Sequence, residues 1–197
     1  MTSALSLTTD TRTTSSDDAD VLAAVSGDEH AFDRLYTGYV PALYRYLRAR
    51  SATPEDAADL TQVVFLNAFR KLGSYRTNAS GFAPWLFGIA RNAANDAYRR
   101  SKTPALSWDI VPDAFMPHAT GQTPEAAALA AEAVARVRTA VTALDRDKQE
   151  LLALRFAAGL TSAQIATVVG KREAAVKKQL WRLVQQLKKD FEDEPLS

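Results

Sequence analysis

Apolar and polar residues alternate with the period of an α-helix along most of the chain, and the two-residue alternation typical of a strand occurs nowhere. Four helical stretches precede a proline-rich segment, and further stretches follow it. We therefore predict an all-α protein of two small helical domains, residues 18–102 and 125–190, joined by a flexible linker at 103–124. Residues 1–17, rich in Ser and Thr, are expected to be a disordered tail, and 191–197 an acidic tail.

Local signals define the helices of the first domain. Asp28 is placed to cap one helix, and Thr53 followed by Pro54 begins the next, because a hydroxyl accepts from free N–H groups and proline suits the first helical position. Gly73 is expected to end that helix. Pro41 lies inside a helical pattern and is expected to kink or interrupt it.

The last helix of the first domain, residues 82–102, has an apolar side that includes Trp85 and Ile89 and ends in Arg99, Arg100 and Lys102. Such a charged end is either a solvated helix face or a surface that holds a polyanion. Neither interpretation is settled by this helix alone.

The second domain contains the pattern of a helix-turn-helix. Thr161 and Gln164 have the spacing of a capping box, and Gly170 permits a sharp turn. In the following helix Val176, Leu180, Leu183, Val184 and Leu187 form an apolar stripe, opposite Ala174, Lys178, Trp181, Arg182 and Gln185, with Lys177 at its margin. This arrangement favours a recognition helix for DNA over an ordinary helical hairpin.

Composition narrows the function classes. The 197 residues carry a net charge of +1, no cysteine and two histidines, His30 and His118, far apart in the sequence. Disulfides, thiolate metal sites and most Ser-His-Asp arrangements are thereby excluded. No apolar run reaches the ~20 residues that span a bilayer, and no signal peptide is recognisable. We expect a cytoplasmic protein that is not an enzyme, with no catalytic residue, cofactor or metal.

Three segments together resemble the extracytoplasmic-function sigma factors of the sigma-70 family, bacterial proteins of transcription initiation. PEDAADLTQVVFLNAFRKL is similar to the family's polymerase-clamp segment, FAPWLFGIARNAANDAYRR to its promoter-melting helix, and LTSAQIATVVGKREAAVKKQLWRL to its C-terminal helix-turn-helix. The resemblance covers residues 20–189 in the family's order. It implies a region 2-like bundle, a region 4-like domain, and a linker that docks inside the polymerase through apolar residues such as Trp108.

The resemblance also assigns site residues. Those expected to contact the β′ clamp of core RNA polymerase are Asp59, Gln62, Phe65 and Phe69, although the two phenylalanines are equally compatible with the core. Those expected at the −10 promoter element are Tyr75, Arg76, Asn78, Phe82, Arg91, Asn92, Asp96, Arg99 and Arg100. Tyr75 and Phe82 are the expected stacking platforms for extruded bases, whereas Trp85 is expected in the core.

At the −35 element the resemblance implies contacts from Arg172, Ala174, Lys177, Lys178, Trp181 and Arg182. The implied partners are core RNA polymerase, through its β′ clamp and β subunits, and promoter DNA, with an anti-sigma factor as a further candidate. Two promoter elements about one and a half turns apart lie ~55 Å from each other, so the linker has to be drawn out between the domains.

Several positions depart from the family pattern. Val63 stands where an acidic residue is usual, and Lys171, Arg172, Ala175 and Gln179 replace the usual residues of the helix-turn-helix. Two alternatives therefore stay open beside a sigma factor that selects and melts promoters. One is a helix-turn-helix regulator acting without core polymerase, and the other is a degenerate sigma-like protein that works through protein contacts alone.

Overall fold

The computed structural model describes residues 14–77, 80–101 and 124–192. Every element in these ranges is helical, which confirms the predicted all-α class. In chain order the elements are α1 (Thr14–Val25), α2 (Glu29–Arg48), α3 (Pro54–Lys71), the 3₁₀ turn η1 (Leu72–Ser74), α4 (Phe82–Ser101), α5 (Pro124–Thr142), α6 (Arg146–Leu152), the π-helical turn η3 (Ala153–Ala157), α7 (Ser162–Val169) and α8 (Glu173–Glu192).

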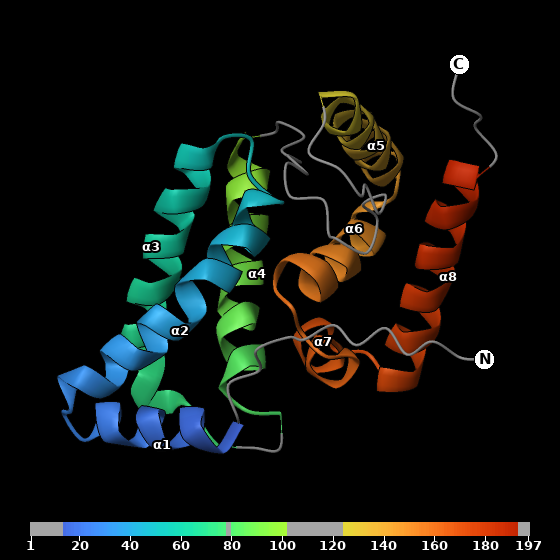
Figure 1. Cartoon of the computed structure of the whole chain (residues 1–197). Helices are drawn as coiled ribbons and strands as arrows, with labels where there is room; N and C mark the ends of the chain where they lie inside the picture. Colours follow the sequence, from blue (N-terminus) through green and yellow to red (C-terminus); the bar gives the residue numbers. More distant parts are fainter. Residues whose placement is uncertain (1–13, 78–79, 102–123, 193–197) are drawn as a thin grey trace.

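Helices α1 to α4 form the first lobe, in which α2 packs on α1 and α3, and α3 packs on α4 (Figure 1). Its core consists of side chains that the helical period places on one side of each helix. Leu35, Leu43 and Leu47 come from α2, and Leu86 and Phe87 come from α4; all are fully buried.

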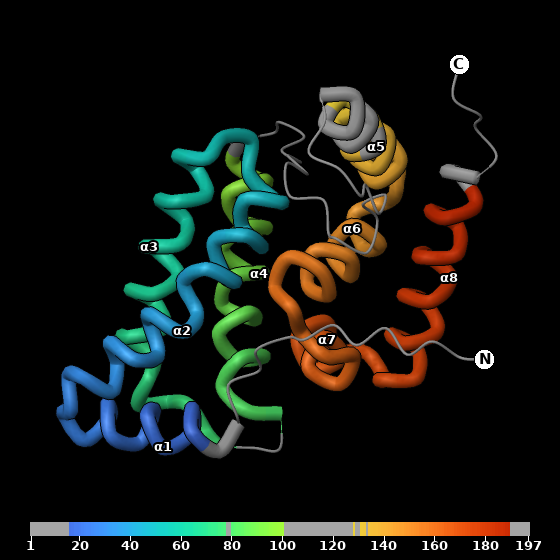
Figure 2. The backbone as a smooth tube through the Cα atoms, viewed as in Figure 1, coloured from blue at the N-terminus to red at the C-terminus, as the bar shows by residue number. Residues whose placement is uncertain are grey.

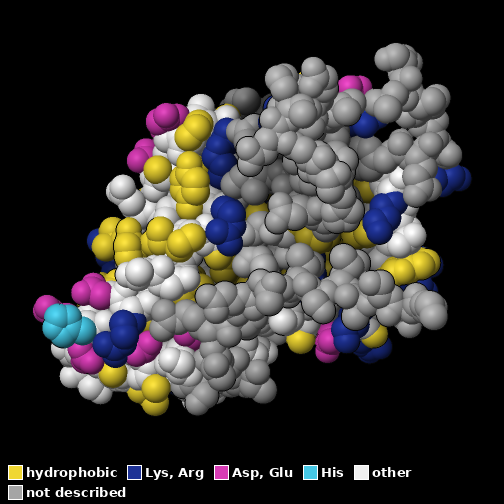
Figure 3. Space-filling model, viewed as in Figure 1, with side chains coloured by type: hydrophobic (Ala, Val, Ile, Leu, Met, Phe, Trp, Pro, Cys, Tyr) yellow, Lys and Arg dark blue, Asp and Glu magenta, His cyan; other side chains and the backbone are white. Residues whose placement is uncertain are grey.

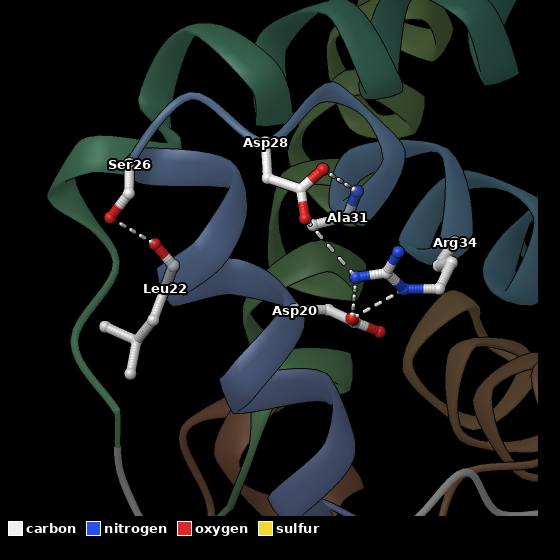
Figure 4. Close-up of polar contacts among 6 residues, drawn as sticks. All are labelled: Asp20, Leu22, Ser26, Asp28, Ala31 and Arg34. Carbon is white, nitrogen blue, oxygen red and sulfur yellow. Dashed lines mark hydrogen bonds and ion pairs between the residues drawn. The ribbon is translucent and has the colours of Figure 1, made fainter.

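Helix α1 begins at Thr14, inside the segment expected to be a disordered tail, so that expectation is wrong for residues 14–17. Its aspartates are held by side chains of other helices. Asp17 accepts a hydrogen bond from the buried Tyr39 hydroxyl, and Asp20 pairs with Arg34 at 2.8 Å, as Figure 4 shows for the latter. These partners lie far along the sequence, which is why local composition did not reveal the helix.

Helix boundaries were mostly predicted correctly, because the capping side chains act locally. Asp28 accepts from the N–H of Ala31 (Figure 4), and Thr53 accepts from the N–H of Asp56. Pro41, however, lies within a continuous α2. The residues on both sides of it, including Leu35 and Leu43, are buried in the same core, and we attribute the unbroken helix to that packing, which offsets the ~3 kcal/mol that proline costs.

Helices α5 to α8 form the second lobe, in which α8 packs against α5, α6 and α7 (Figure 2). Thr161 and Gln164 make both hydrogen bonds of the predicted capping box, and Gly170 ends α7 with φ +67°. Only glycine adopts this left-handed conformation at little cost, so the turn of the helix-turn-helix depends on Gly170.

The two lobes pack against each other, which the sequence did not predict. Helix α7 lies against α4, η3 lies against α2, and buried residues of both lobes form a single apolar core. The linker at 103–124, including Trp108, lies outside the described residues except for Pro124, which begins α5. Among the described helices none combines the length and apolar character that crossing a membrane requires.

Candidate polymerase-binding and DNA-binding surfaces

An apolar surface lies on the outer side of the first lobe. We call it the α2–α3 patch and define it as Tyr36 of α2 with Val63, Leu66 and Phe69 of α3, which are 42 to 58% exposed. In Figure 3 hydrophobic side chains gather over this side of the molecule. The predicted clamp residues Asp59 and Gln62 are exposed on the same face of α3. A cavity of about 560 Å³ between α3 and α4 adjoins this face and is lined partly by Asp59 and Val63.

The structure separates the two phenylalanines that the sequence left ambiguous. Phe65 is 5% exposed and its ring lies 4.6 Å from the Tyr36 ring, whereas Phe69 is 58% exposed and leans edge-on against Phe32 at 4.9 Å. Phe69 can therefore reach a partner directly, while Phe65 supports the patch from below.

The predicted stacking platforms are covered in this arrangement. Phe82 is 1% and Tyr75 7% exposed, and their rings pack edge-to-face at 5.7 Å. Trp85, expected in the core, is only partly buried beside them. Neither ring presents an open face in this arrangement, and the Tyr75 hydroxyl donates to Asp18 of α1 at 2.6 Å, which holds that ring inward. Their role as stacking platforms stays a prediction. Burial and this hydrogen bond raise the pKa of Tyr75 well above its usual range.

The polar side of α4 carries most of the other residues expected at the −10 element. Asn92, Asp96, Arg99 and Arg100 are exposed, and Asp96 pairs with Arg99 one turn away. Arg76 is exposed in the preceding loop and donates to the carbonyls of Gly73 and Tyr75. Asn78 lies outside the described residues.

Arg91, by contrast, faces the second lobe, with its Nε 3.8 Å from a carboxylate oxygen of Glu150. Glu150 is 5% exposed; it accepts a hydrogen bond from the Tyr46 hydroxyl at 2.8 Å and forms an ion pair with Arg50. Burial lowers the pKa of Arg50 and raises that of Tyr46. The sequence pattern did not reveal this cluster, because Glu150 lies about one hundred residues after Tyr46 and Arg50. The one local signal for its burial is that Glu150 precedes the apolar run LLAL.

Helix α8 presents the predicted recognition face to solvent. Val176, Leu180, Leu183 and Leu187 are buried, while Trp181 is 65% exposed. All six residues expected at the −35 element are exposed, namely Arg172, Ala174, Lys177, Lys178, Trp181 and Arg182. Lys177 pairs with Glu173 one turn earlier at 2.6 Å.

Comparison with known proteins bears on these surfaces. Residues 35–103 match the family model Sigma-70 region 2. The chain is 33% identical over 172 residues to the ECF RNA polymerase sigma factor BldN of Streptomyces coelicolor, covering 87% of this chain and 64% of that protein. It is 32% identical over 179 residues to the ECF RNA polymerase sigma factor SigD of Mycobacterium tuberculosis, covering 88% of this chain and 83% of that one.

This chain belongs to the extracytoplasmic-function sigma factors of the sigma-70 family. Family membership favours a sigma factor over a helix-turn-helix regulator that never joins polymerase.

Two solved structures share the fold of this chain. CnrH in complex with the cytosolic domain of CnrY aligns with a TM-score of 0.65 at 23% identity, over 91% of this chain and 99% of that one. RpoE in complex with the anti-sigma factor NepR from Bartonella quintana aligns with a TM-score of 0.59 at 22% identity, over 83% and 98%. The residue-level roles on this sigma factor remain predictions.

Proposed function

We propose that this sigma factor binds core RNA polymerase through the α2–α3 patch and selects and melts promoters with α4 and α8. The exposed patch carries the proposal, because Leu66 and Phe69 are 49% and 58% exposed beside Asp59 and Gln62. Large apolar side chains exposed together are typical of protein-binding surfaces. The resemblance to the family supports this assignment, because the segment similar to the family's clamp-binding segment is this same helix.

On DNA we assign α4 to the −10 element and α8 to the −35 element. Arg99 and Arg100 at the end of α4 would hold backbone phosphates, and Asn92 would lie near the extruded base. Lys178, Trp181 and Arg182 project from the early turns of α8, where a recognition helix reaches base edges. This role requires no catalytic group of the chain's own, since the polymerase performs the chemistry.

We also propose that an anti-sigma factor binds this chain. RpoE was solved in complex with the anti-sigma factor NepR, and CnrH in complex with the cytosolic domain of CnrY. The α2–α3 patch of this chain offers an apolar surface on which such a partner could dock. Affinity purification of the tagged chain from its own cells, followed by mass spectrometry, tests this. A partner recovered with the wild type and lost with Phe69→Ser supports the proposal, whereas recovery of polymerase alone contradicts it.

Run-off transcription with purified core polymerase and a library of genomic promoter fragments tests the main proposal. We expect initiation to depend on the chain, and Phe69→Ser to reduce it at least ~5-fold at limiting protein, because exposed aromatic anchors typically contribute more than ~1 kcal/mol to an interface. Leu22→Ser is the matched control, since Leu22 is 61% exposed on α1 outside the patch. Absence of initiation from every fragment would refute the proposed function.

A further inference from the structure

A cavity of about 280 Å³ lies where the turn after α2, the second half of α4 and the start of α6 come together. We call it the arginine cavity, because four guanidinium groups line it, those of Arg50, Arg91, Arg99 and Arg146. Among the described residues only two carboxylates share this lining. The cavity therefore carries more positive than negative charge.

The buried carboxylate of the cavity already has partners of its own. Glu150 is 5% exposed, accepts a hydrogen bond from the Tyr46 hydroxyl at 2.8 Å and forms an ion pair with Arg50. Arg91 Nε is 3.8 Å from a Glu150 oxygen, too far for a hydrogen bond, and it is buried with no acceptor among the described residues. Because a buried N–H group without an acceptor is unfavourable, Arg91 offers a donor that a bound acceptor would satisfy.

The charged groups at the edge of the cavity leave the excess unchanged. The second lining carboxylate, Asp147, lies 3.8 Å from Lys171 Nζ, and Arg99 pairs with Asp96. These two outer partners add one positive and one negative charge. With four guanidinium groups against two carboxylates in the lining, two positive charges stay without a counter-charge among the described residues.

The guanidinium groups are held in place by contacts within the chain. Arg50, with a side chain only 9% exposed, donates to Asn95 Oδ1 at 2.8 Å, and Arg146 stacks over the Tyr98 ring at 3.4 Å. Burial lowers the pKa of Arg50, and the positive charges of Arg146 and Arg91 lower it further. An anion bound among these groups would relieve their mutual repulsion, and the planar guanidinium suits phosphate oxygens because it donates two parallel hydrogen bonds.

We propose that the arginine cavity binds a small phosphate-bearing anion, such as inorganic pyrophosphate or the phosphate groups of a nucleotide. Arg91 and Arg99 are also expected to contact DNA at the −10 element, but the cavity is a small space among three segments and includes Arg50 and Arg146, for which no DNA contact is expected. Its size favours a compact anion over a strand of DNA. The site goes beyond the proposed function, because it requires neither polymerase nor a promoter.

Isothermal titration calorimetry of the full chain with sodium pyrophosphate tests the site, with sodium chloride holding the ionic strength constant. We expect saturable binding of one anion per chain. Arg146→Gln should weaken it about tenfold or more, because it removes a charged hydrogen-bond donor from an exposed side chain whose loss leaves the core intact. Arg70→Gln is the matched control, since Arg70 is exposed in the last turn of α3, at the end away from Arg50.

A second variant separates a built site from general attraction to positive charge. Arg91→Lys keeps the charge but removes the buried Nε donor, and we expect it to weaken pyrophosphate binding about fivefold, with native helicity by circular dichroism. Unchanged affinity in this variant would contradict the proposal. So would equal losses in Arg146→Gln and Arg70→Gln, or no saturable binding by the wild type at millimolar pyrophosphate.

Single-stranded DNA of mixed sequence, titrated in the same way, distinguishes the two sources of phosphate. We expect Arg146→Gln to leave its affinity within about twofold of the wild type, since the cavity takes a compact anion. If DNA binding depends on Arg146 while pyrophosphate does not bind, the arginines hold a DNA backbone and the proposal is wrong. Failure of the wild type to initiate transcription would refute the proposed function and leave these titrations unaffected.

Discussion

At the scale of single residues, hydrogen bonds between aspartates of α1 and tyrosine hydroxyls attach this helix to the rest of the first lobe. Asp17 and Asp18 accept hydrogen bonds from Tyr39 and Tyr75, on α2 and in the loop before α4. Each bond joins the first helix to a segment much later in the chain. The tyrosine expected to stack on a base therefore acts, in this arrangement, as a support of the fold.

Tyr75→Phe should lower the free energy of unfolding by about 1 kcal/mol at neutral pH, because it removes one side-chain hydrogen bond and leaves Asp18 unpaired. Urea denaturation followed by circular dichroism measures this. Tyr36→Phe, at a ring that is 42% exposed, should change stability by less than half as much. Equal effects of the two substitutions would contradict the structural role of Tyr75.

Tyr75→Phe should also change how the free energy of unfolding depends on pH in the alkaline range. Burial and Asp18 raise the pKa of Tyr75 in the folded state above the ~10 of a free phenol. As the pH rises, the Tyr75 hydroxyl therefore loses its proton in the unfolded chain before it does so in the folded protein. The contribution of Tyr75 to the free energy of unfolding is fully present below about pH 10 and decreases as the pH rises above that value. Between pH 9 and 11 the free energy of unfolding should decrease less steeply with pH in Tyr75→Phe than in the wild type. An identical slope in both proteins would contradict the raised pKa of Tyr75.

At the scale of elements, α8 shows how far a periodic pattern determines a surface. Its buried stripe and exposed face agree with the sequence prediction, because α8 packs on α5, α6 and α7 along a single side. What the period does not give is the position of α8 on DNA. In a recognition helix the early turns approach the bases, so charges on one face should differ in importance along its length.

Lys178→Ala should weaken binding of the chain to duplex DNA carrying its −35 element and reduce the slope of log affinity against log salt by about one. Lys189→Ala is the control, because it removes the same charge from the last turn of α8. Fluorescence anisotropy titrations at several salt concentrations measure both. Equal losses in the two variants would indicate non-specific attraction to the helix rather than a docked recognition face.

At the scale of the whole molecule, both lobes share one apolar core. Fully buried Leu35 and Phe87 belong to the same cluster as Leu154 and Ile165 of the second lobe. Shared burial couples the unfolding of the lobes, since separating them exposes apolar surface on each.

We expect the wild type to unfold by calorimetry in a single transition whose calorimetric enthalpy equals its van't Hoff enthalpy. Glu150→Gln leaves Arg50 without its counter-charge between the lobes and should show two transitions. Glu173→Gln, which removes an exposed carboxylate paired with Lys177 within α8, should retain one. Two transitions in the wild type would mean that the lobes fold independently and that their contact is too weak to couple them.

Within the described residues the sequence by itself determined the helical class, most helix boundaries and the solvent face of α8. It did so because these depend on groups within a few residues of one another. Asp28 caps the third residue after it, Thr161 and Gln164 bond reciprocally, and Gly170 sets its own backbone angle. Two local signals failed. Pro41 did not interrupt its helix, because burial on both sides overrode its effect, and the Ser- and Thr-rich composition did not reveal the start of α1.

Only the tertiary structure decided which side chains face each other across the chain. It buried Phe65 and exposed Phe69, although both lie in one helix and each ring contacts an aromatic ring of α2. It placed Glu150 beside Tyr46 and Arg50, about one hundred residues earlier, and so joined two lobes that the sequence presents as separate. Such contacts follow from the docking of whole surfaces, which no local period or cap specifies.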